Sequence, residues 1–206
     1  MAAIIFDFDG TIADSFDYVA GFLAAEAKRS PLDEVQQDEL RGLSMLAMAR
    51  QLGCSWWRLP NLFLRGRRGM GKVIKQIEPF DGMPEVIRKL HAEGHQLLIL
   101  SSNTVRNVHS FLHTQHLHTY FLEIYGSIGL FGKAQALRRL LRDQHIARNE
   151  AIYIGDELRD VQAAQSVGVR VVAVTWGLAR SADLAAREPA GLADTPADLI
   201  RILEEL

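Results

Sequence analysis

The chain has little of several features that mark specialised protein classes. Its 206 residues include one cysteine, Cys54, which can form neither an intrachain disulfide nor a cysteine-built zinc site. The 23 lysines and arginines are balanced by 25 aspartates and glutamates, so the basic excess of a general nucleic-acid binder is missing. No apolar run approaches the ~18 residues that a membrane span requires. We therefore expect a cytoplasmic protein with neither nucleic-acid nor membrane partners.

The composition is that of a globular protein with a substantial core. Hydrophobic residues make up 48% of the chain and charged residues 23%, which is ordinary for a folded domain. A chain of this length buries roughly 70% of its unfolded surface, so it needs no disulfide or metal to fold. The length fits one domain with a sizeable insertion.

Four short apolar runs have the near-continuous hydrophobicity of strands that are buried on both faces of a parallel sheet. They lie at Ala3–Phe8, Gln96–Ser101, Ala151–Gly155 and Val169–Thr175. A helix-like stretch precedes each of the last three runs. This alternation predicts βαβ units and an α/β fold with a doubly wound, Rossmann-like parallel sheet.

One segment interrupts the alternation. Between residues 15 and 79 only helical patterns occur, such as the apolar residues at i, i+3, i+4 and i+7 from Phe16. An all-helical insert after the first strand predicts a cap above the carboxyl ends of the strands, where open α/β sheets bind ligands. We expect an α/β core of residues 1–14 and 80–206 and a helical cap of residues 15–79.

Carboxylates follow two of the predicted strands. Asp7 and Asp9 leave the first strand two residues apart and can face one site, and Gly10 then permits a sharp turn. Asp156 and Asp160 follow the third strand and can share one face of the next helix. Either pair alone is also typical of turns and helix N-caps. Together at one sheet edge they would repel one another, which a hard divalent cation such as Mg²⁺ would relieve.

Polar residues at two further junctions are candidates for binding phosphate. Ser101, Ser102 and Asn103 follow the second strand, where a hydroxyl and backbone N–H groups could hold phosphate oxygens. Serine and asparagine are equally common as plain helix caps. Lys133 opens the helix after a glycine-rich segment. A lysine at that position opposes the helix dipole, which indicates a role other than helix stability.

Taken together, these motifs resemble the haloacid dehalogenase-like superfamily, and within it the phosphoglycolate phosphatase-like group with a helical cap of the first type. The matching positions are Asp7–Ser15 for the first motif, Ser101 for the second, Lys133 for the third, and Gly155, Asp156 and Asp160 for the fourth. All four motifs occur in the family's order, and the resemblance covers essentially the whole chain.

The resemblance implies a Mg²⁺-dependent phosphatase that hydrolyses a small phosphorylated metabolite, a phosphoglycolate-like phosphomonoester. Asp7 would be the nucleophile that forms an aspartyl-phosphate, and Asp9 would protonate the leaving alcohol and later activate water. Ser101 and Lys133 would hold the phosphate, with Ser102 and Asn103 beside them. The implied metal ligands are Asp7, the backbone carbonyl of Asp9 and Asp156, with Asp160 assisting directly or through water.

Two alternatives stay open. A sugar-phosphate mutase of the β-phosphoglucomutase kind would use the same aspartyl-phosphate and return the phosphate to its substrate. A non-catalytic binding protein could retain the scaffold, although loss of Asp7 or Asp9 would be the natural mark of that change. Asp9 also disfavours dehalogenation, because true dehalogenases of the superfamily lack the second aspartate.

The cap offers cationic candidates for substrate binding. Arg41, beside Gly42, is expected to contact the part of the substrate beyond its phosphate. From Arg58 to Lys75 the sequence has six basic residues and no acidic one. Such a run is commonly a solvated face, and the alternative is that one or two of its arginines steer an anionic substrate beneath the cap.

Overall fold

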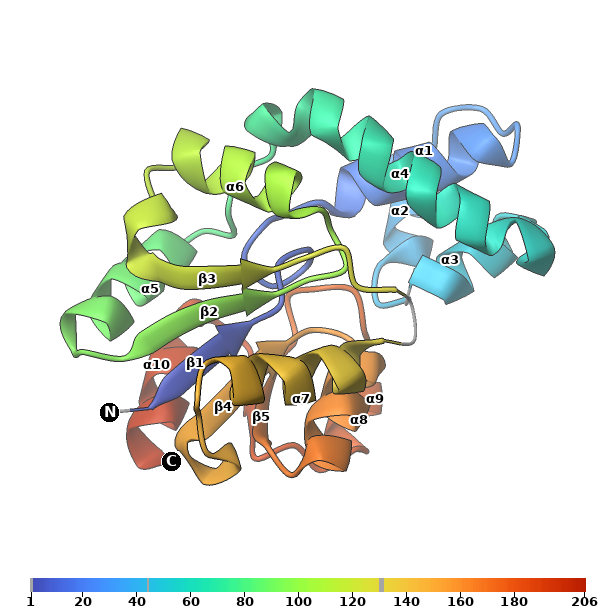
Figure 1. Ribbon diagram of the computed structural model, residues 1–206. Helices are drawn as coiled ribbons and strands as arrows, with labels where there is room; N and C mark the ends of the chain where they lie inside the picture. Colours follow the sequence, from blue (N-terminus) through green and yellow to red (C-terminus); the bar gives the residue numbers. More distant parts are fainter. Residues whose placement is uncertain (1, 44, 130–131) are drawn as a thin grey trace.

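A parallel sheet forms the centre of the computed structural model, which describes residues 2–43, 45–129 and 132–206 (Figure 1). Part of the glycine-rich segment ahead of Lys133 therefore lies outside the described residues. The strands are β1 (Ala3–Phe6), β2 (Gln96–Leu100), β3 (Phe121–Tyr125), β4 (Ala151–Gly155), β5 (Arg170–Val174) and β6 (Gly191–Ala193). Their order in the sheet is β3-β2-β1-β4-β5-β6, with every neighbouring pair parallel. The order reverses between β1 and β4, which creates the switch point where such sheets bind ligands.

Helices cover both faces of this sheet. One face carries α5 (Met83–Ala92), α6 (Val105–Thr114) and α10 (Pro196–Glu205), and the other carries α7 (Lys133–Asp143), α8 (Leu158–Val167) and α9 (Ser181–Ala185). Successive β1 side chains alternate between the two layers, with Ile4 and Phe6 in one apolar cluster and Ile5 in the other. The predicted doubly wound α/β fold is confirmed.

Between β1 and α5 the regular elements that the structure describes are helices and 3₁₀ turns, apart from the isolated bridges of Ala13 with Asp9 and Pro79. The helices are α1 (Phe16–Glu26), α2 (Glu34–Leu40), α3 (Met45–Gln51) and α4 (Leu59–Val73), with 3₁₀ turns η1 (Trp56–Arg58) and η2 (Ile74–Gln76). Two further turns are η3 (His118–Tyr120) and η4 (Arg148–Glu150). Figure 1 shows α1 to α4 beyond the ends to which the β2 and β3 arrows point. Within the described ranges, no helix combines the length and apolar character needed to cross a membrane.

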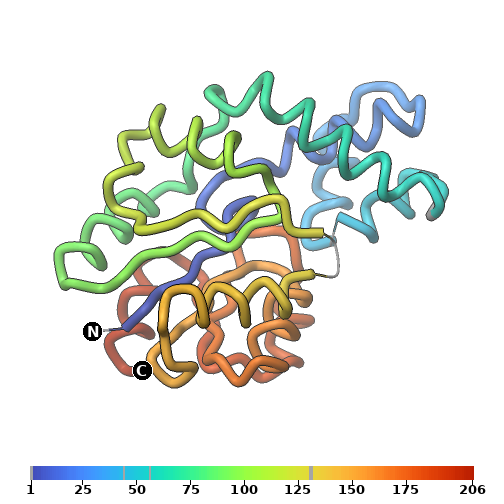
Figure 2. Tube along the Cα trace, in the orientation of Figure 1, coloured from blue at the N-terminus to red at the C-terminus, as the bar shows by residue number. Residues whose placement is uncertain are grey.

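The two segments that join the helical insert to the core run side by side (Figure 2). Ala13 forms an antiparallel bridge with Pro79, and the Asp14 N–H donates to the Glu78 carbonyl at 3.0 Å. The end of the helical insert already packs on the core, through Met70 in the last turn of α4, Ile74 in η2 and Ile77 directly after η2. The helices α1 to α3 instead contribute to another apolar cluster, which Leu178 of the loop after β5 joins from the core.

Candidate active site

The carboxyl ends of β1 and β4 bring three of the predicted aspartates together. Asp7 directly follows β1, whereas Asp156 and Asp160 lie after β4 and in the first turn of α8. All three side chains are buried, and one carboxylate oxygen from each lies within 4.8 Å of the other two. The chain thus concentrates three acidic groups at the point where the strand order reverses.

Lys133 supplies positive charge to this cluster. It is the first residue of α7 and is buried, and its Nζ donates to Asp7 Oδ2 at 2.5 Å and also to Asp160 Oδ1. Burial acts to lower the pKa of Lys133, but the Asp160 and Asp7 carboxylates outweigh it and raise that pKa. The ammonium therefore stays charged and links the two carboxylates. This contact explains a lysine at a helix start better than helix stability does.

Repulsion and burial make the carboxylates costly to ionise. Burial raises the pKa of Asp7 to about 7, although the nearby Lys133 ammonium opposes the rise. Burial and the charges of Glu157 and Asp7 raise the pKa of Asp156 well above its usual range. Asp7 Oδ1 is buried without a hydrogen-bond partner among the described residues. An unpartnered carboxylate oxygen beside two other carboxylates is a donor set that suits a hard divalent cation.

Asp156 is held by contacts from both flanking loops. Thr11 Oγ1 donates to its Oδ1 at 2.9 Å, and the Leu178 N–H donates to its Oδ2 at 2.8 Å. Gly10 has φ +80°, and a Cβ there would lie 2.2 Å from Asp156 Oδ2. The turn after β1 therefore needs glycine both for its conformation and for space, in line with the sequence prediction. Sequence reasoning gave no role to Thr11 or Leu178.

Asp9 lies next to the cluster and has different partners. Its carboxylate accepts hydrogen bonds from Asn103 Nδ2 at 3.0 and 3.3 Å. Burial raises the pKa of Asp9, although hydrogen bonds from Ser15 and Asn103 act against the rise. The buried Ser101 hydroxyl accepts the Asn103 N–H at 2.9 Å. Asn103, which follows β2 as the sequence indicated, thus orients Asp9, and Ser101 contacts Asn103 in turn.

The start of α8 contributes further charged groups for which the sequence predicted no function. Arg159 Nε donates to Glu157 Oε1 at 2.9 Å, and Arg159 Nη1 is buried without a hydrogen-bond partner among the described residues. Tyr153 donates its hydroxyl to Asp160 Oδ1 at 3.2 Å. Glu157 and Arg159 lie between the two predicted aspartates of the fourth motif, so only their position in that segment could have indicated them.

A cavity extends from Asp9 into the cap. Its walls are mostly apolar side chains of α1, α3 and α4, among them Val19, Phe22, Leu46, Ala49, Leu62 and Phe63. Its polar lining comprises Asp9, Tyr18, Arg67, Ser102, Asn103, Glu157 and Arg159. The space beside the predicted proton donor is therefore enclosed largely by hydrocarbon.

Arg41 is the predicted site residue that lies away from both the carboxylate cluster and this cavity. Its guanidinium carbon lies 4.4 Å from the centre of the Phe16 ring. Its nitrogens lie 3.7 Å from an Asp17 oxygen and 3.6 Å from an Asp38 oxygen, and its side chain is 54% exposed. Arg41 is thus paired with carboxylates on the outside of the cap, whereas the other predicted residues lie together at the sheet edge.

The chain is similar to known proteins in sequence and in structure. The model of the haloacid dehalogenase-like hydrolase family matches residues 4–174. The chain is 35% identical to a phosphoglycolate phosphatase of Synechococcus elongatus, an alignment that covers 100% of this chain and 99% of that one. A haloacid dehalogenase-like hydrolase of Streptococcus pneumoniae has a similar structure, with a TM-score of 0.79, 22% identity and 98% of each chain covered. A Thermotoga maritima protein described as a β-phosphoglucomutase gives a TM-score of 0.70 at 19% identity, with 100% of each chain covered.

Proposed function

The chain belongs to the haloacid dehalogenase-like hydrolase family and is a phosphatase, and from this premise we propose that it hydrolyses a small phosphomonoester of the phosphoglycolate kind with Mg²⁺ as cofactor. The observation that carries the proposal is the buried Asp7–Lys133 pair beside Asp156 and Asp160. The relative that is 35% identical and named a phosphoglycolate phosphatase supports the substrate class.

Asp7 is the proposed nucleophile. A bond forms between one of its carboxylate oxygens and phosphorus while the bond from phosphorus to the ester oxygen breaks, which leaves an aspartyl-phosphate. Lys133 holds the carboxylate through Oδ2 and offsets negative charge as the phosphoryl group approaches. Ser101, with Ser102 and Asn103 beside it, is proposed to bind the phosphate oxygens together with Lys133.

Asp9 is the proposed general acid and base. Its raised pKa keeps a proton on the carboxyl group closer to neutral pH, and that proton passes to the departing ester oxygen. The carboxylate then accepts a proton from the water that attacks phosphorus. The Asp7–phosphorus bond breaks, so inorganic phosphate leaves and both aspartates return to their starting states. Asn103 fixes the orientation of Asp9 through both of its carboxylate oxygens.

The donor set fits Mg²⁺. The proposed ligands are the carboxylates of Asp7, Asp156 and Asp160 with the backbone carbonyl of Asp9. Asp7 Oδ1 is free to bind the ion, because no described residue donates a hydrogen bond to it. When bound, the ion supplies charge neutralisation at the phosphoryl oxygens. The like charges that raise the pKa of Asp156 would be neutralised by the same ion.

One experiment tests the proposal and separates it from the mutase alternative, since the likeness to the Thermotoga maritima protein shows the fold alone. Purified protein is incubated with a panel of small phosphomonoesters, with Mg²⁺ or with chelator, and inorganic phosphate is measured. We expect Mg²⁺-dependent release without any bisphosphate activator. Transfer of phosphate back to a sugar phosphate, with no net release, would establish a mutase instead.

A further inference from the structure

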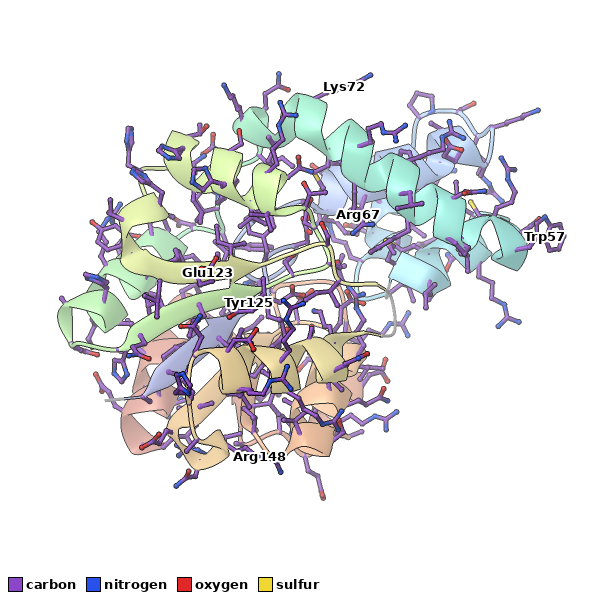
Figure 3. All side chains as sticks on the ribbon, in the orientation of Figure 1. Trp57, Arg67, Lys72, Glu123, Tyr125 and Arg148 are labelled. Carbon is purple, nitrogen blue, oxygen red and sulfur yellow. The ribbon has the colours of Figure 1, made fainter. Side chains whose placement is uncertain are left out.

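Arg67 stands apart from the other basic residues of α4. Of the six basic residues between Arg58 and Lys75, only Arg67 lines the cavity that begins at Asp9. Figure 3 shows Arg67 on the side of α4 that faces the core, whereas Lys72 points away from it. The basic segment therefore directs one guanidinium toward the candidate active site and leaves its other charges outside that cavity.

The charge of Arg67 is not paired with a carboxylate in the part of the chain that the structure describes. Its Nη1 donates to the Ser102 carbonyl at 2.9 Å and its guanidinium carbon lies 4.5 Å from the centre of the Phe63 ring. Among the described residues it has no carboxylate partner, unlike Arg159, which pairs with Glu157, and Arg65, which pairs with Glu26. Burial lowers the pKa of Arg67, as expected for a half-buried cation. A charge among apolar walls is costly until an anion pairs with it.

The position of Arg67 indicates which part of a substrate supplies that anion. The Ser102 carbonyl that it contacts lies between Ser101, proposed to bind the phosphoryl group, and Asn103, which orients the proposed acid Asp9. Arg67 is thus next to the point where the ester oxygen leaves. One of its five N–H donors is used by Ser102, and others remain for a bidentate contact.

We propose that Arg67 determines specificity by binding a carboxylate on the leaving group, so that the substrates are phosphate esters of small hydroxy acids. This inference rests on the proposed function. A single carboxylate balances one uncompensated guanidinium, whereas a second phosphate would bring up to two negative charges into a cavity already lined by Asp9 and Glu157. The apolar walls contact the carbon atoms between the two anionic groups.

The test compares two esters of similar size, 2-phosphoglycolate and ethyl phosphate, which differ in having a carboxylate or a methyl group. For Arg67→Met, the ratio of kcat/KM for phosphoglycolate to that for ethyl phosphate should fall by about 10- to 150-fold, the usual effect of losing a charge-assisted hydrogen bond. Arg67→Lys keeps the charge but loses the bidentate geometry, so its ratio should lie between that of the wild type and that of Arg67→Met.

Arg65→Met and Arg68→Met are matched controls, because both side chains are exposed on the same helix. Each should keep the wild-type ratio. An equal loss on both esters in Arg67→Met would overturn the proposal, because it would show that Arg67 supports the cap or binds the phosphoryl group itself. A larger loss on a bisphosphate than on phosphoglycolate would assign the anion as phosphate and would also overturn it.

A binding measurement distinguishes failure of the proposed phosphatase function from failure of the Arg67 proposal. If the wild-type protein releases phosphate from no ester, binding of the same two esters to Asp7→Asn and to Asp7→Asn/Arg67→Met is measured by calorimetry. A preference for phosphoglycolate that disappears with Arg67 would support the carboxylate assignment without any turnover. A preference that is unchanged, or absent from both variants, would contradict it.

Discussion

The two sides of the cavity differ in how their charges are balanced. On the core side, Arg159 of the cavity lining contacts Glu157, and Lys133 of the neighbouring carboxylate cluster contacts Asp7 and Asp160. On the cap side Arg67 faces mostly hydrocarbon and has no such partner among the described residues. The core side is therefore prearranged for the reaction common to every ester. On the cap side, the charge of Arg67 is paired only when an anionic leaving group is bound. The proposed catalytic residues and the proposed specificity residue thus lie on different sides of the cavity.

The largest expected effect comes from the core side. Asp7→Asn removes the proposed nucleophile while conserving volume, so kcat should fall more than about 1,000-fold on every ester tested, whatever its leaving group. Circular dichroism should show an intact fold. The matched control is Asp81→Asn, an exposed aspartate in the turn directly before α5. Turnover of Asp7→Asn within tenfold of wild type would defeat the assignment.

Metal removal should also affect all esters alike. Chelator should reduce phosphate release to background, and Ca²⁺ should suppress it because it prefers more ligands at longer distances. Free Mg²⁺ at 100 times its Kd should stabilise the fold by about 2.7 kcal/mol, which corresponds to a Tm increase of roughly 5–10 °C for a protein of this size. Asp156→Asn should lose most of that increase. Full activity in excess chelator would exclude the carboxylate cluster as a required metal site.

The pH dependence of stability tests the cost of the buried carboxylates. Since the pKa of Asp7 is raised from 3.8 to about 7, the metal-free folded state binds more protons than the unfolded state between these values. The contribution of the Asp7 carboxyl group to the free energy of unfolding is therefore present at low pH and is lost as the pH rises through 7. The Tm of metal-free Asp7→Asn minus that of wild type should therefore grow from pH 5 to pH 8. A difference that shrinks over this range would contradict the assigned direction.

The sequence predicted that the acidic residues of the core side lie together because its signals there are local. Asp7 and Asp9 are two residues apart at a strand end, and Asp156 and Asp160 are four residues apart at a helix start. The parallel topology then brings both pairs to one edge. The partners that fix them could not be predicted in this way, since Thr11 reaches Asp156 across 145 positions of sequence and only the fold brings them together.

The cap side and the sheet edges were less predictable for a related reason. The strand β3 has exposed Leu122 and Glu123 at the edge of the sheet, and β6 has three residues, so neither shows the continuous apolar run of a central strand. In the cap, the sequence shows many arginines but not which helix face meets the core. It favoured Arg41 as the substrate contact, whereas the structure places Arg67 at the cavity.

The smallest expected effect separates these two cap arginines. Arg41 pairs with the exposed Asp17 and Asp38 and covers the Phe16 ring, and exposed ion pairs contribute about 0.2–1 kcal/mol. Arg41→Ala should therefore lower Tm by at most about 4 °C and change kcat/KM by less than about threefold, equally for phosphoglycolate and ethyl phosphate. The measurement is the same ratio that is used for Arg67. A loss of about tenfold or more confined to phosphoglycolate would show that Arg41 turns inward to bind the substrate, and selectivity would then depend on movement of α2 and not on the charge that already faces the cavity.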